Sequence, residues 1–157
     1  MRSTPFGLAF VGALYSCALA QAQSASADLK PQQSPQAVVD EHMDALNACD
    51  VDRIMAQYPE DAQISPPDSG GIRGKSAIRE AFTDLCKDRK DGGFKGTHFG
   101  VMSSKRVGDS IVIDWVATAP FLAAPAMGAD AFITKDGLIQ AMVTTLDPAV
   151  YFKVKKQ

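Results

Sequence analysis

The first half of the chain has apolar residues at the three- and four-residue spacing of amphipathic helices. A serine followed by a proline at residues 34 and 35 is a typical helix start, and the apolar positions continue to residue 49. Asp50 can cap a second, shorter helix that Pro59 ends. A third helix is expected over residues 75–87.

A short hairpin is expected between the second and third helices. Residues 62–65 have the pattern of a short strand, and the turn-rich loop 66–71 leads to a second short strand that ends at Arg73. From residue 94 onward the spacing of apolar residues changes to that of strands. Long strands are predicted over residues 94–107, 111–121, 128–134 and 138–146.

This order of elements predicts an α+β fold, with three N-terminal helices packed on a curved, mostly antiparallel sheet. A length of 157 residues fits one domain. We divide the chain into residues 1–22, a spacer at 23–33, a folded domain at 34–152 and a basic tail at 153–157. The spacer is rich in Ser, Ala and Gln without an aromatic residue, so it is expected to be disordered.

Residues 1–22 have the pattern of a secretory signal peptide. Arg2 precedes an uncharged apolar run over residues 6–20, and Ala20 and Ala22 provide a small-residue cleavage site. The run of about 15 residues is shorter than the roughly 20 that a membrane span needs. The sequence therefore predicts an exported protein, periplasmic or extracellular. Cleavage after Ala27 and lipid attachment at Cys17 are the alternatives.

Composition narrows the range of partners. Removing residues 1–22 takes away Arg2 and no acidic residue, so the formal net charge changes from −2 to −3. No basic stripe interleaved with aromatic residues is present, which argues against a nucleic-acid partner. In an oxidising compartment Cys49 and Cys86 are expected to form a disulfide, with two ordinary buried cysteines as the alternative. No CxxC or HxxxH spacing accompanies the two cysteines, so a metal site is not expected.

Three motifs resemble the nuclear transport factor 2-like superfamily, and most closely its SnoaL-like and ketosteroid isomerase branch. They are Ala45-Leu46-Asn47-Ala48-Cys49-Asp50, Tyr58-Pro59-Glu60-Asp61-Ala62 and Gly71-Ile72-Arg73-Gly74-Lys75-Ser76-Ala77-Ile78-Arg79. The resemblance covers residues 36–147 and implies a cystatin-like cone of helices and sheet around a central pocket. Expected pocket-lining residues are Phe82, Phe99, Met102, Trp115, Phe121, Met127 and Phe132. Filling of the core by the same side chains is the alternative.

The resemblance also implies candidate catalytic residues. His42 falls where the isomerases have their oxyanion tyrosine, and Asp130 falls where they have a protonated acid. The position of the isomerase base is taken by Pro66, which cannot accept a proton. Asp68 is the candidate substitute base, although aspartate in such a turn also serves by binding backbone amides.

Two functions follow from these residues. One is a cofactor-independent isomerase, cyclase or lyase that acts on a hydrophobic carbonyl compound by general acid–base catalysis. The other is a non-catalytic module with the same fold that binds an apolar small molecule or forms a homodimer. Loss of the usual base and the predicted export favour the second function.

Overall fold

The computed structural model describes residues 28–67 and 70–146. The predicted signal peptide, most of the spacer, Asp68 and the basic tail therefore lie outside the described residues. All three expected helices are present: α1 (Pro35–Asn47), α2 (Val51–Met55) and α3 (Lys75–Leu85). A short 3-10 turn, η1 (Arg89–Asp91), follows in the loop after α3.

The caps that the sequence predicts define where the first two helices begin. The Ser34 hydroxyl accepts a hydrogen bond from the backbone N–H of Ala37 at 3.2 Å, and Pro35 follows at the first helical position. The Asp50 carboxylate accepts one from the backbone N–H of Arg53 at 3.0 Å. Each cap satisfies a helical N–H that has no partner within its own helix.

The six strands form one sheet in the order β2-β1-β6-β5-β4-β3. The short strands are β1 (Gln63–Ser65) and β2 (Ile72–Arg73), and the long ones are β3 (His98–Val107), β4 (Ser110–Thr118), β5 (Ala126–Lys135) and β6 (Leu138–Leu146). All neighbours are antiparallel except β1 and β6, which run parallel. Three helices on a curved, mostly antiparallel sheet confirm the predicted α+β fold.

Several strand boundaries differ from the prediction; β4, for example, ends at Thr118 rather than at residue 121, because the chain turns there. β3 begins at His98 because residues 94–97 form a turn, in which the Thr97 N–H donates to the Phe94 carbonyl at 3.0 Å. Gly96 in that turn has a φ of 86°, which glycine adopts without strain. β5 begins at Ala126, two residues earlier than expected, because Ala126 already pairs with Ala117.

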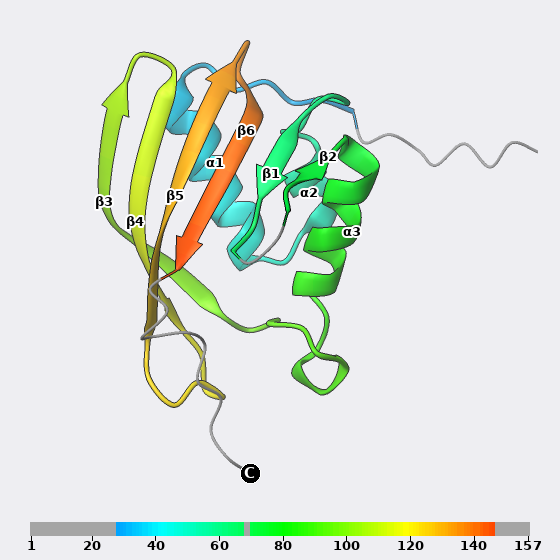
Figure 1. Ribbon diagram of the computed structural model, residues 1–157, viewed down its shortest axis with the longest axis vertical. Helices are drawn as coiled ribbons and strands as arrows, with labels where there is room; N and C mark the ends of the chain where they lie inside the picture. The colour runs from blue at the N-terminus through cyan, green and yellow to red at the C-terminus, as the bar shows by residue number, and fades with distance from the viewer. Residues whose placement is uncertain (1–27, 68–69, 147–157) are drawn as a thin grey trace, which may run out of the picture.

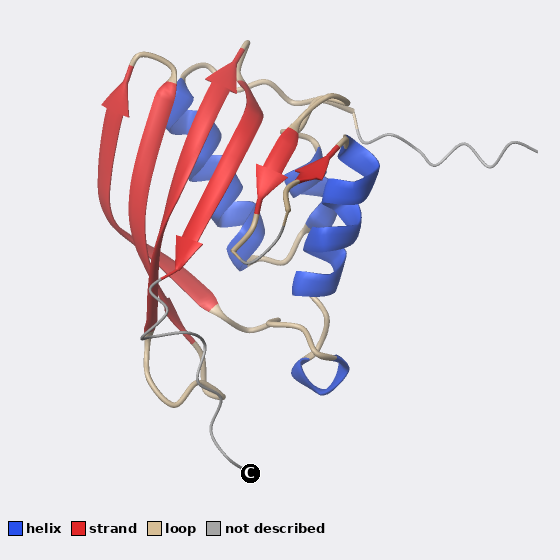
Figure 2. Cartoon of the chain, viewed as in Figure 1, coloured by secondary structure: helices blue, strands red, loops and turns tan. Residues whose placement is uncertain are grey.

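The sheet has one covered face and one open face. Figure 1 shows α1 crossing behind the four long strands and α3 lying beside β1 and β2, and Figure 2 shows that the helices all lie on the same side of the sheet. Alternate residues of β4, such as Ile111, Ile113 and Trp115, point to the helices and are buried. We call this covered side the inner face and the opposite side the outer face. No helix among the described residues is long and apolar enough to cross a membrane.

Candidate functional site

His42 is carried into the interior by α1. The side chain is 1% exposed, and its ring meets the rings of Tyr58, Phe82 and Phe132 edge to face at centroid distances of 5.9, 5.7 and 5.4 Å. Burial lowers the pKa of the imidazole to about 4, because the charged form loses its hydration. The imidazole is therefore neutral at neutral pH, and its Nδ1 has no hydrogen-bond partner among the described residues.

Asp130 lies on the inner face of β5, directly opposite Thr144 of β6. The residue is only 6% exposed, and burial raises the pKa of its carboxyl group. Hydrogen bonds with the Thr144 and Trp115 side chains oppose this increase in pKa. Oδ1 has no hydrogen-bond partner in the described part of the chain. The protonated form of a carboxyl group is favoured in such surroundings, so Asp130 is suited to donate a hydrogen bond or a proton.

Tyr58 connects these two residues, and the sequence reasoning did not identify it as a site residue. Its ring contacts His42. Burial raises the pKa of the phenol well above its usual value, and the nearby charge of Asp130 adds a smaller increase. The phenolic hydroxyl donates to the Met142 sulfur at 3.6 Å. The available signal was a tyrosine at the first position of the Tyr58-Pro59-Glu60-Asp61-Ala62 motif, where the family commonly has phenylalanine.

Trp115 adds a third buried polar group to the inner face. The residue is 2% exposed, and its ring stands edge to face on Phe99 at 5.4 Å. The indole lies beside the Asp130 carboxyl, and the hydrogen bond between the two side chains opposes the increase in the pKa of Asp130. Unpartnered polar atoms are rare in protein interiors, and among the described residues His42 Nδ1 and Asp130 Oδ1 are two of them. An arrangement of this kind is suited to hold a polar atom of a ligand within an apolar environment.

Four of the seven expected pocket residues lie on or next to this interior. Phe82, Trp115 and Phe132 are buried, and Phe99 is half-buried against Trp115. Phe121 lies elsewhere, in the loop after β4, where it contacts Phe94, and the Arg89 guanidinium lies 5.8 Å from its ring centroid.

The expectation that Met102 and Met127 line the central pocket is corrected, because both are exposed on the outer face. The inner positions of β5 are Gly128, Asp130 and Phe132, so Met127 points outward by alternation. Met102 lies at a bulge in β3. The bulge places Met102 and Ser103 consecutively on the outer face.

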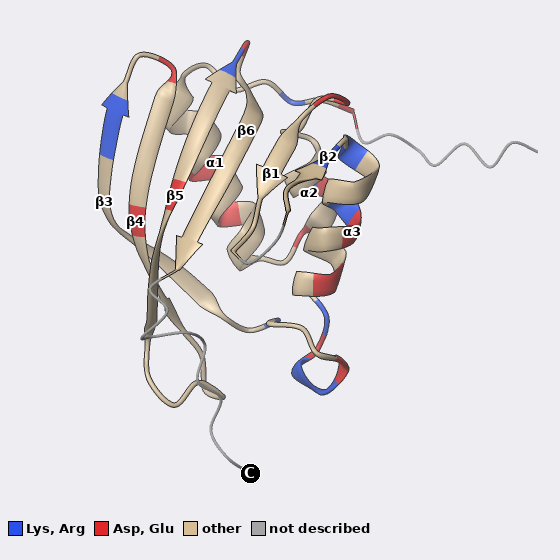
Figure 3. Cartoon of the chain, viewed as in Figure 1, with Lys and Arg blue, Asp and Glu red and all other residues tan. Residues whose placement is uncertain are grey.

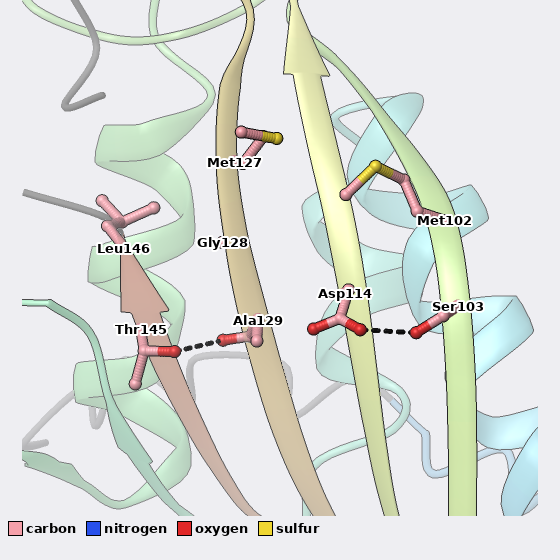
Figure 4. Close-up of a pocket in the computed structure, with 8 residues that line it drawn as sticks. All are labelled: Met102, Ser103, Asp114, Met127, Gly128, Ala129, Thr145 and Leu146. Atoms are coloured by element: carbon pink, nitrogen blue, oxygen red, sulfur yellow. Dashed lines mark hydrogen bonds between the residues drawn. The ribbon is translucent and has the colours of Figure 1, made fainter. Parts of the chain in front are cut away.

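These two methionines line a shallow outer groove of about 420 Å³. Figure 4 shows it crossing β3 to β6, with the Ser103 hydroxyl donating to the Asp114 carboxylate. Asp114 is thus an exposed charge on the outer face. His98 is also exposed, at the start of β3.

The base position remains without a described candidate. Pro66 follows β1 directly and cannot take up a proton, while Asp68 lies outside the described residues. The structure brings His42, Tyr58 and Asp130 into one interior cluster but gives no position for the predicted base. Within the described ranges, no three His, Cys, Asp or Glu side chains are grouped so that they could hold a metal ion.

Cys49 and Cys86 are half-buried free thiols. Cys49 follows α1 and Cys86 caps the end of α3. Burial, followed by a hydrogen bond with Cys49, raises the pKa of the Cys86 thiol to about 12. The two side chains are therefore neighbours, and the disulfide stays a prediction.

Comparison with known proteins agrees with this architecture. The sequence profile of the SnoaL-like domain matches residues 39–142. An NTF2-like protein of unknown function from Cytophaga hutchinsonii superposes with a TM-score of 0.61 at 14% identity, covering 80% of this chain and 100% of that one. No curated protein matches the chain by sequence.

Two further solved structures have names that refer to reactions. A proposed ketosteroid isomerase from Kribbella flavida has a TM-score of 0.57 at 18% identity, with 72% of this chain and 77% of that one covered. An epoxide hydrolase from M. tuberculosis has a TM-score of 0.58 at 16% identity, with 73% and 84% covered. At these identities the likeness shows the shared fold.

Proposed function

The chain belongs to the SnoaL-like domain family, and on that premise we propose that it is a cofactor-independent isomerase, cyclase or lyase acting on a hydrophobic carbonyl compound. General acid–base catalysis would be supplied by the cluster of His42, Tyr58 and Asp130. The isomerase and hydrolase named among proteins of the same fold support a catalytic role.

The observation that carries the proposal is the buried Asp130 carboxyl with its unpartnered Oδ1. Burial favours the protonated form, so the group can donate a hydrogen bond to a substrate carbonyl oxygen. As negative charge develops on that oxygen, the hydrogen bond becomes stronger. The surrounding rings exclude water and thereby increase the effect.

His42 and Tyr58 fit the same role as uncharged polar groups. With a pKa of about 4, the His42 imidazole is a weak base and is suited to orient a substrate or donate a hydrogen bond from its N–H. The raised pKa of Tyr58 keeps its phenol protonated. Asp68 is proposed as the base on the sequence argument alone.

Solvent-deuterium exchange into a conjugated ketone tests the catalytic proposal. The purified protein is expected to accelerate exchange at the carbon next to the carbonyl, and Asp130→Asn and His42→Ala are expected to reduce the rate by about 10²-fold. Asp114→Asn is the matched control, because Asp114 is exposed on the outer face. The absence of exchange above the buffer rate for a panel of such ketones would exclude this reaction.

A second role, homodimer formation through the outer face, is favoured by a row of apolar side chains. Val112, Ala131 and Val143 lie side by side across β4, β5 and β6, and Met127 and Ile133 are exposed on the same face. β6 carries no charged residue, and Figure 3 shows most charges on the helices, the loop after α3 and the end of β3, with acidic positions also on β4 and β5. We propose a second copy of the chain as the partner, because one apolar patch can cover its own copy in a two-fold dimer.

Export remains part of the proposal on the basis of residues 1–22. Expression in a bacterium followed by fractionation is expected to recover the protein outside the cytoplasm, with a mature N-terminus at Gln23 or Asp28. An intact N-terminus in the cytoplasmic fraction would contradict export.

A further inference from the structure

The two cysteines of the described chain form a pair of sulfur donors. Cys49 follows α1 and Cys86 caps α3, and Figure 1 shows that both helices end at the same end of the molecule. A hydrogen bond joins the two thiols, and both residues are half-buried, so that solvent reaches the pair. Their spacing along the chain does not indicate a metal site, but the fold brings the two sulfur atoms into contact.

The backbone of Cys49 adopts a conformation that suits glycine. Its φ is 50°, in the left-handed region where a Cβ crowds the following carbonyl oxygen. Glycine is the usual residue in this conformation after a helix. Other residues in strained backbone conformations cluster at functional sites. Glycine would serve the fold at least as well, so we attribute the cysteine at this position to a use of its sulfur.

Both cysteines are held in position before any ligand binds. The Cys49 N–H donates to the Leu46 carbonyl at 3.0 Å, and the Cys86 N–H donates to the Phe82 carbonyl at 3.0 Å. The Phe82 ring packs against the His42 ring of α1 at a centroid distance of 5.7 Å, which fixes the spacing of the two helices. A site whose donors are already ordered loses little conformational freedom on binding.

A positive charge lies beside the pair. The Lys95 ammonium is close enough to Cys86 to stabilise the negatively charged thiolate. The Lys95 N–H donates to the Lys87 carbonyl at 3.1 Å, which holds this loop against the end of α3. The ammonium also lies 3.7 Å from the Asp88 carboxylate in an exposed ion pair. An ion with a charge of +1 and two thiolates together carry one negative charge, which the lysine partly offsets.

The number and type of donors select the ion. Thiolates are soft ligands, and the ions that they favour include Cu(I) and Zn(II). Structural zinc sites use four protein ligands. Within the described ranges, no group of three His, Cys, Asp or Glu side chains is available to build such a site. Cu(I) accepts two sulfurs on opposite sides. At metal–sulfur distances of about 2.3 Å the two sulfurs would lie about 4.6 Å apart, so a small side-chain movement admits one ion.

We propose that Cys49 and Cys86 bind one Cu(I) ion between their sulfur atoms. Each thiol releases its proton to solvent and forms one sulfur–copper bond, and the copper stays in the +1 state. The predicted disulfide uses the same two sulfurs, but its formation transfers two electrons to an oxidant. The ion and the disulfide therefore exclude each other. The inference goes beyond the proposed function and does not depend on it.

Competition with a coloured chelator tests the site. The chain with Cys17→Ser, in which Cys49 and Cys86 are the remaining cysteines, is reduced, and the reductant is removed under nitrogen. Mixing with the Cu(I) complex of bathocuproine disulfonate is expected to bleach the complex until one ion per chain has been transferred. In the parallel experiment with Zn(II) and a zinc-sensitive dye, the ion is expected to stay with the dye.

Three variants separate a site built by the pair from other binding. Cys49→Gly removes one donor and relieves the left-handed backbone, so the melting temperature is expected to stay the same or rise. Loss of a residue that only orients a metal ligand lowers affinity by about 10- to 100-fold, so loss of a ligand is expected to cost more than about 100-fold. Cys86→Ser is expected to cause the same loss. Met102→Leu combined with Met127→Leu removes the exposed thioethers of the outer face and is expected to change nothing.

The outcomes are decisive in both directions. Transfer of one ion that Cys49→Gly and Cys86→Ser each abolish, in proteins with unchanged circular dichroism, would support the site. No transfer from the chelator, or Zn(II) bound as tightly as Cu(I), would overturn it. Equal Cu(I) affinity of folded Cys49→Gly, or loss of binding in the methionine variant, would also overturn it. Deuterium exchange measured without copper tests the catalytic proposal separately, so either proposal can fail while the other holds.

Discussion

At the scale of single residues, the buried side chain of His42 makes the stability of the fold depend on pH. Three aromatic rings surround the imidazole and prevent its hydration when charged. Its pKa falls from 6.5 to about 4 on folding. Between these two values the unfolded chain binds a proton that the folded chain does not, so lowering the pH favours unfolding.

We therefore expect the contribution of His42 to the free energy of unfolding to be constant above pH 6.5 and to fall as the pH decreases toward 4. The loss from this residue is about 3 kcal/mol. Urea unfolding at a series of pH values in the wild type and in His42→Leu measures it, and the variant is expected to lose this part of the pH dependence. The control is His98→Gln, since His98 is exposed. The same pH profile for His42→Leu and wild type would contradict the prediction.

At the residue scale, the sequence placed His42 and Asp130 in the interior, and both are buried. Their catalytic roles stay predictions. Met102 and Met127 were misplaced, because an apolar residue in a strand does not reveal which face it occupies. Tyr58 was missed because its position depends on the segment after α2 lying against β6, where its hydroxyl meets Met142. That contact joins segments far apart in the chain.

At the scale of elements, a single carboxamide ties the end of α1 to the edge of the sheet. The Asn47 Nδ2 donates to the Phe99 carbonyl at 3.0 Å, and the Phe99 N–H donates to Asn47 Oδ1 at 2.8 Å. Asn47 thus pairs with Phe99 as a neighbouring strand would, on the side of β3 that has no strand partner. Phe99 in turn supports the Trp115 ring.

Asn47→Ala is expected to lower the free energy of unfolding by about 2 kcal/mol, since two part-buried hydrogen bonds are lost. Amide hydrogen exchange of Phe99 should become faster, while exchange in β6 changes little. Gln36→Ala on the same helix is the control, because its side-chain hydrogen bonds with Asp40 and Ser104 are both exposed. A loss of stability in Gln36→Ala as large as that in Asn47→Ala would argue against a specific role for the pair.

The neighbouring thiols at the ends of α1 and α3 allow a second test at this scale. In protein recovered from an oxidising compartment, Cys49 and Cys86 are expected to form a disulfide that closes a loop of about 37 residues and adds up to roughly 4 kcal/mol. Thiol titration of the unfolded, unreduced mature protein is expected to find no reactive thiol. Cys49→Ser should leave one. Two reactive thiols in the unchanged protein would refute the bridge.

The elements themselves could be predicted largely from sequence. Helix starts followed from Ser34 and Asp50, because side-chain caps are local interactions. The bulge at Met102 could not be predicted, since it depends on the register between β3 and β4. The pairing of β1 with β6 could not be predicted either, because the two strands are more than 70 residues apart and no local pattern indicates that they pair.

At the scale of the whole molecule, the uneven distribution of charge leaves one broad surface suited to association. The outer face carries Val112, Met127, Ile133 and Val143 with Asp114 among them. A surface of this kind on a monomer is usually an interaction site.

Sedimentation velocity is expected to show a dimer in which the outer faces meet. Val112→Lys combined with Val143→Lys places two charges on the central row and should shift the equilibrium to monomer. Val107→Lys is the matched control, because Val107 is 82% exposed at the end of β3, away from this row. A monomer in the unchanged protein at micromolar concentration, or dissociation by Val107→Lys as well, would contradict the proposed interface.

The central place of β6 has a consequence for biosynthesis. Its residues are among the last of the domain to leave the ribosome, yet they alone join the β1–β2 pair to the remaining strands. A nascent polypeptide that lacks them holds two strands of two and three residues, too short to persist in water without neighbours. We therefore expect the β1–β2 pair to become stable only after β6 has been synthesised, so that the sheet stays incomplete until then.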